Sequence, residues 1–122
     1  MRKILAVLIL AIATGLGCAT APQTPAQSVY AVQGSYAAAL QIAVTYKQLP
    51  SCAKPAAPVL CSDAAVVAKL QKADDVAYAA LTAAQNTVRT PGAGANVQTA
   101  IVAAQQATAA FASITATLRT KP

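Results

Sequence analysis

The chain has 122 residues, of which 57% are hydrophobic and only 10% are charged, and its formal net charge is +6. It contains no histidine and no glutamate, so the commonest general bases and most zinc-ligand sets are excluded. The only carboxylate side chains are Asp63, Asp74 and Asp75, and a hydroxyl nucleophile would have only lysine as its base. We therefore predict a protein that is not an enzyme, with no catalytic residues, no cofactor and no metal site.

The first eighteen residues have the layout of an export signal. Arg2 and Lys3 precede an apolar run, residues 4–13, which is followed by small residues and then by Cys18. A membrane-spanning helix needs about 20 apolar residues, and this run is roughly half as long. We therefore expect residues 1–17 to be removed as a signal peptide.

The end of this segment resembles the lipobox of bacterial lipoproteins, in which a leucine and small residues precede a cysteine. Leu16, Gly17 and Cys18 carry the resemblance, although Leu16 stands one position nearer to the cysteine than the motif leucine, whose usual place is taken by Gly15. The resemblance implies that the Cys18 thiol receives diacylglycerol, and that the mature protein carries fatty acids such as palmitate.

The same resemblance predicts a small bacterial or prophage-encoded lipoprotein of unknown function. Because Ala19 rather than an aspartate follows the cysteine, it implies the periplasmic face of the outer membrane. Two other cleavage positions, after Ala21 and after Ala26, remain open, and either would release a soluble exported chain.

The cysteine count agrees with lipidation of Cys18. Cys52 and Cys61 lie in one proline-rich segment and can pair, which leaves Cys18 as the odd thiol. Zinc ligation by Cys52 and Cys61 would have too few donors, because no histidine and no further cysteine is near. We predict a structural disulfide between them, formed in an oxidising periplasm.

The residues after Cys18 are enough for one small domain. We expect a lipidated tether, 18–23, and a single helical domain, 24–122. Apolar residues recur at three-to-four spacing in three segments, 25–49, 63–89 and 97–118, which predicts an all-α, alanine-rich, up-down-up three-helix bundle with the disulfide in its first loop. Thr24 with Gln27, Ser62 and Asn96 are the expected helix caps. The predicted core stripes contain Val29, Val32, Tyr36, Leu40, Ala43 and Val44; Val66, Leu70, Ala73, Ala77, Leu81, Ala84 and Val88; and Val97, Ala104, Ala107, Phe111, Ile114 and Leu118.

Among the polar and aromatic residues, Tyr30 and Tyr46 lie off the first core stripe. They are our candidates for contact with a partner or with lipid headgroups. Asp74 and Asp75 project about 100° apart on a helix, so we expect them to balance surface lysines (Lys47, Lys69, Lys72) rather than to share one site. Basic residues scattered over three helices of an exported chain do not predict nucleic-acid binding.

Together these features predict a lipid-anchored structural or interaction module of the bacterial cell envelope, with the membrane and an envelope protein as partners. The alternative is a soluble secreted or periplasmic binding protein or inhibitor. The pattern leaves the oligomeric state open.

Overall fold

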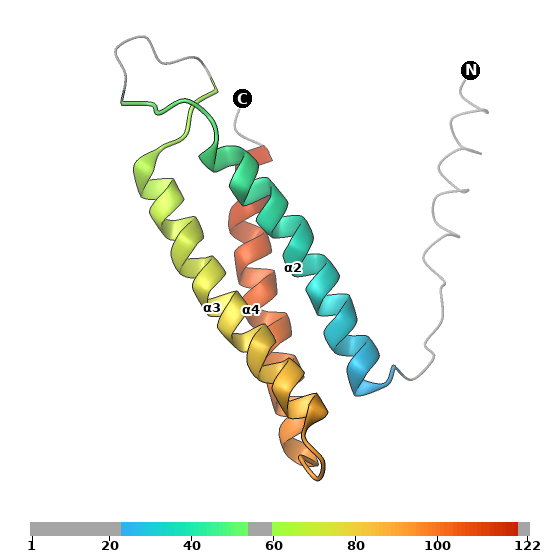
Figure 1. The fold of residues 1–122 in the computed structure, drawn as a ribbon. Helices are drawn as coiled ribbons and strands as arrows, with labels where there is room; N and C mark the ends of the chain where they lie inside the picture. The colour runs from blue at the N-terminus through green and yellow to red at the C-terminus, as the bar shows by residue number, and fades with distance from the viewer. Residues whose placement is uncertain (1–22, 54–59, 120–122) are drawn as a thin grey trace, which may run out of the picture.

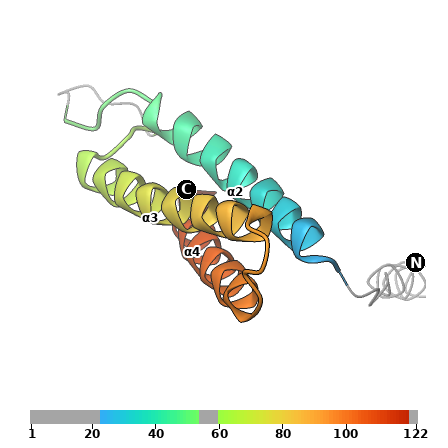
Figure 2. The ribbon, with the colours of Figure 1, turned by 60° about the horizontal axis from the view of Figure 1, so that its bottom comes forward.

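The computed structural model describes residues 23–53 and 60–119, which form three helices (Figure 1). They are α2 (Pro25–Lys47), α3 (Ala64–Arg89) and α4 (Ala95–Arg119). Successive helices run in opposite directions, and each packs against both others, so that they form a triangle rather than a flat layer (Figure 2). No strand occurs in these ranges. The predicted all-α three-helix bundle is therefore confirmed. The predicted signal 1–17, Cys18 and residues 19–22 of the tether lie outside the described residues.

The start of α2 follows from local chemistry. The Thr24 hydroxyl accepts a hydrogen bond from the amide of Gln27, and the Gln27 side chain accepts one from the amide of Thr24, at 3.3 and 2.9 Å. Pro25 occupies the first turn, where its missing N–H costs nothing. The predicted capping box is confirmed. The helix ends at Lys47, two residues before the predicted end.

The starts of the other two helices differ from prediction. Asp63, not Ser62, caps α3, because its carboxylate accepts from the amides of Ala65 and Val66. Before α4 the chain turns through Gly92 and Gly94, both with positive φ (79° and 48°), a conformation that favours glycine. Because the helix begins directly after this turn, at Ala95, Asn96 lies inside the first turn instead of capping it.

The core consists of two clusters stacked along the bundle. One, near the α3–α4 turn, contains Val29, Val32, Leu81, Ala84, Ile101 and Ala104. The other, nearer the first loop, contains Ala39, Ala43, Leu70, Ala77 and Phe111. The half-buried Tyr36 packs against both. Phe111 is the largest fully buried side chain in the described ranges, and alanines supply much of the remaining core.

Most of the predicted core stripes are buried or half-buried, with one exception on α2. Val44 is 45% exposed, because it lies beside an open groove between α2 and α3. On α4 the structure adds three buried residues that the predicted stripe omitted: Ile101, Thr108 and Thr115.

Truncating Phe111 tests this core. Phe111→Ala should lower the free energy of unfolding by about 3 to 5 kcal/mol, because it leaves a cavity that small neighbours cannot fill. Val102→Ala removes a partly exposed side chain of the same helix and should cost far less. Urea unfolding followed by circular dichroism measures both. Equal losses in the two variants would contradict the assignment of Phe111 as the centre of the core.

Candidate functional site

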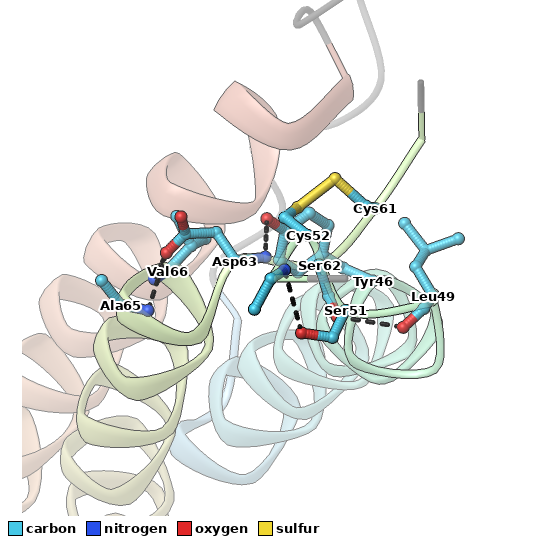
Figure 3. The surroundings of a disulfide bond; sticks show 10 residues. Tyr46, Leu49, Ser51, Cys52, Cys61, Ser62, Asp63, Ala65 and Val66 are labelled. Carbon is cyan, nitrogen blue, oxygen red and sulfur yellow. Dashed lines mark hydrogen bonds between the residues drawn. A yellow bond between two sulfur atoms is a disulfide. The ribbon is translucent and has the colours of Figure 1, made fainter. Parts of the chain in front are cut away.

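The predicted disulfide closes the connection between α2 and α3 (Figure 3). Cys52 and Cys61 are bonded, and their Cα atoms are 5.0 Å apart. The Cys52 amide donates to the carbonyl of Ser62 at 3.0 Å, and the Ser62 amide donates to the carbonyl of Pro50 at 2.8 Å. Residues 54–59, which include Lys54, lie outside the described residues. The disulfide thus sits beside a short bridge of backbone bonds that joins the two sides of the loop.

Two side-chain hydrogen bonds strengthen this connection, and one of them reaches α2. The Ser62 hydroxyl donates to the Leu49 carbonyl at 3.0 Å, and the Asp63 amide donates to the Tyr46 hydroxyl oxygen at 3.0 Å. Because Asp63 also caps α3, Tyr46 links the last full turn of α2 to the first turn of α3 (Figure 3). We call the disulfide, Tyr46, Ser62 and Asp63 the end clamp.

The two tyrosines singled out from the sequence therefore have different environments. Tyr46 is half-buried against the second core cluster, its hydroxyl oxygen accepts the bond from Asp63, and it also lines an open groove between α2 and α4. Tyr30 is 78% exposed on the second turn of α2. Tyr30 is therefore the more accessible of the two candidates.

A second link joins α2 and α3 near their middles. The Tyr36 hydroxyl donates to a carboxylate oxygen of Asp74 at 2.6 Å, and its ring lies 6.0 Å from that of Phe111 and 6.5 Å from that of Tyr78, between centroids. The prediction that Asp74 balances surface lysines missed this bond. The donor, Tyr36, lies on another helix, 38 residues away in the sequence.

The surroundings of Tyr36 change the pKa of its hydroxyl. Burial raises the pKa of the Tyr36 hydroxyl far above its ordinary value, and the hydrogen bond to Asp74 and that carboxylate's charge raise the pKa further. Tyr36 therefore stays protonated and serves as a hydrogen-bond donor. This environment is the reverse of what a tyrosine acting as a base or nucleophile needs.

Open grooves lie between the helices on the remaining surface. The groove between α2 and α3 has a volume of about 380 Å³, and its lining includes Asp74, Asp75 and Lys47. The groove between α2 and α4 near the end clamp, of about 490 Å³, is lined by Tyr46, Leu49 and Leu118. Within the described ranges, no three acidic or cysteine side chains gather where they could hold a metal ion.

Two buried polar side chains on α4, Thr108 and Thr115, were missed from the sequence. The Thr108 hydroxyl oxygen is buried and has no hydrogen-bond partner among the residues that the structure describes. It lies beside a groove between α4 and the first turns of α2, which Ser28 and Ser35 also line. Thr115, by contrast, donates to the carbonyl of Ala112 at 2.8 Å.

Comparison with known proteins adds no function. No family model, no curated protein and no solved structure matches the chain.

The pH dependence of stability tests the Tyr36–Asp74 link. An unfolded tyrosine ionises near pH 10, whereas folded Tyr36 keeps its proton, so the wild type should lose stability as the pH rises above about 10. Tyr36→Phe should remove this part of the alkaline loss and cost about 1 to 3 kcal/mol at pH 7, because Asp74 loses its donor.

Tyr78→Phe is the matched control, since Tyr78 is an exposed tyrosine beside the same ring. Thermal unfolding from pH 7 to 11.5 measures all three proteins. An alkaline loss in Tyr36→Phe as large as in the wild type would refute the role given to this hydroxyl.

Proposed function

We propose that this chain is a lipid-anchored, non-enzymatic module of the bacterial cell envelope, which acts by binding or bracing another envelope component. The proposal begins with residues 2–18, where a basic pair, an apolar run and small residues precede Cys18. In this arrangement Cys18 carries the lipid, and the three-helix bundle is the part displayed in the periplasm.

The observation that carries the proposal is the disulfide between Cys52 and Cys61. Structural disulfides persist in oxidising compartments, which favours export of the chain. The chain has three cysteines, so this pairing leaves Cys18 as the one available for acylation. Cys18 precedes Thr24, the cap of α2, by six residues. A tether of this length reaches at most about 20 Å, which would hold the bundle close to the membrane.

Helix α4 is the other element to consider as a membrane anchor. Its stretch Ala95–Leu118 is long and apolar enough to cross a bilayer by length and composition. However, Ile101, Ala104 and Phe111 of this helix are buried against α2 and α3. Removing α4 from the bundle would expose both core clusters, so we assign the anchoring role to Cys18.

The second candidate is a soluble exported binding protein or inhibitor. The groove between α2 and α4 favours it, because this groove exposes more apolar than polar surface beside Tyr46 and Leu118. Such a protein would use the same fold without a lipid. The state of Cys18 therefore decides between the two candidates.

Replacing Cys18 tests the anchor. In the wild type the mature chain should begin at Cys18, carry a lipid mass and stay with membranes after a high-salt wash, because several acyl chains anchor firmly. Cys18→Ser should abolish labelling by a fatty acid. Intact-mass spectrometry and membrane fractionation measure these outcomes, with Ser51→Ala as a control for expression. An unmodified chain that begins at Pro22 or Gln27 would refute the anchor and favour the soluble candidate.

A further inference from the structure

The two ends of the bundle are chemically different. At one end lies the end clamp. At the other, which we call the proximal end, α2 begins, α3 ends and the turn 90–94 leads into α4 (Figure 1). All residues that precede Gln23, Cys18 among them, join the bundle at the proximal end. Since α2 has 23 residues, the end clamp stands about 35 Å away from it.

The two ends also differ in charge. Near the end clamp the described charges are of both signs, Asp63 with Lys47, and Asp74 and Asp75 lie near the middle of α3. At the proximal end the charged side chain among the described residues is Arg89, which is exposed in the last turn of α3. Two helices begin there and one ends, so two positive dipole ends accompany this cation. The proximal end is thus free of described acidic groups and favours an anionic surface.

The exposed aromatic side chain Tyr30 lies at this same end, on the second turn of α2. A tyrosine combines an apolar ring with a polar hydroxyl, and this combination is enriched where a membrane meets water. An exposed ring has no role in the core, but it fits the level of lipid headgroups.

We propose that the bundle stands on the membrane by its proximal end, with Tyr30 among the lipid headgroups and Arg89 against anionic phospholipid. This orientation rests on the proposed lipid anchor and extends it from attachment at one cysteine to contact by the folded domain. It places the end clamp roughly 35 Å from the membrane, which is the length of α2. The end clamp and the grooves beside it are then the surfaces presented to an envelope partner.

A single tryptophan at different heights measures this orientation, because the natural chain contains none. Tyr30→Trp places the reporter at the proximal end. Val44→Trp is the matched control: Val44 is also exposed, lies on nearly the same side of α2 and is about 21 Å farther along the axis. Each lipidated mature protein is reconstituted in vesicles of phosphatidylcholine and phosphatidylglycerol whose acyl chains are brominated near the headgroup.

The Tyr30→Trp protein should lose about half of its emission and shift to the blue, whereas the Val44→Trp protein should keep the emission it has in unbrominated vesicles. Quenching at both positions would show a bundle lying flat, and quenching at neither in protein that floats with the vesicles would show a freely tethered one. Either result overturns the orientation. A chain without lipid that does not float refutes the proposed function, and this orientation with it.

The contact between Arg89 and anionic phospholipid is tested in the same assay. Arg89→Gln in the Tyr30→Trp background should reduce the extra quenching that phosphatidylglycerol gives over pure phosphatidylcholine, because one basic residue near an anionic surface changes partitioning about fivefold. Lys69→Gln, which removes an exposed cation far from the proximal end, should leave this difference unchanged. Equal effects of the two variants would contradict the contact assigned to Arg89.

Discussion

The structure depends on close packing between helix faces made largely of alanine. Small side chains let the helices approach one another, but each alanine buries little area. Because neighbouring alanines have the same shape, a helix shifted along its partner would pack almost as well. Phe111 is the large side chain that is fully buried in the described ranges. The relative position of the helices therefore needs further determinants. The end clamp supplies one, and the hydrogen bond between Tyr36 and Asp74 supplies another, both joining α2 to α3.

These links relate the fold to its proposed place in the envelope. Both lie away from the proximal end, where the core cluster around Leu81 and Ile101 closes the bundle through apolar contacts. A disulfide-stapled end is suited to face an oxidising periplasm, while an end with an exposed tyrosine and an arginine is suited to lipid headgroups. In our proposal one end of this small domain contacts the membrane, and the opposite end is presented to an envelope partner.

Local chemistry in the sequence predicted the helices, the capping box and the disulfide, because each depends on residues that lie close together in the chain. Two of the errors, at Ser62 and Asp74, came from distant contacts. Ser62 and Asp63 can both cap a helix, and the choice is made by the Leu49 carbonyl, which takes the Ser62 hydroxyl. Asp74 was predicted to be a surface charge because its partner, Tyr36, lies on another helix. The candidate site at Cys18 lies outside the described residues and stays a prediction.

The central claim is that the disulfide and the tyrosine hydrogen bonds, rather than the alanine core, set the helix positions. The most direct measurement is a proton NMR spectrum of a variant that lacks the Tyr36–Asp74 bond, the Tyr46–Asp63 bond and the disulfide: Tyr36→Phe, Tyr46→Phe, Cys52→Ser and Cys61→Ser. Our account predicts that circular dichroism stays helical while the side-chain signals, including those of Phe111, lose their dispersion, as in a core without unique packing. A dispersed spectrum with the native contact between rings 36 and 111 would contradict it, and so would complete loss of helix.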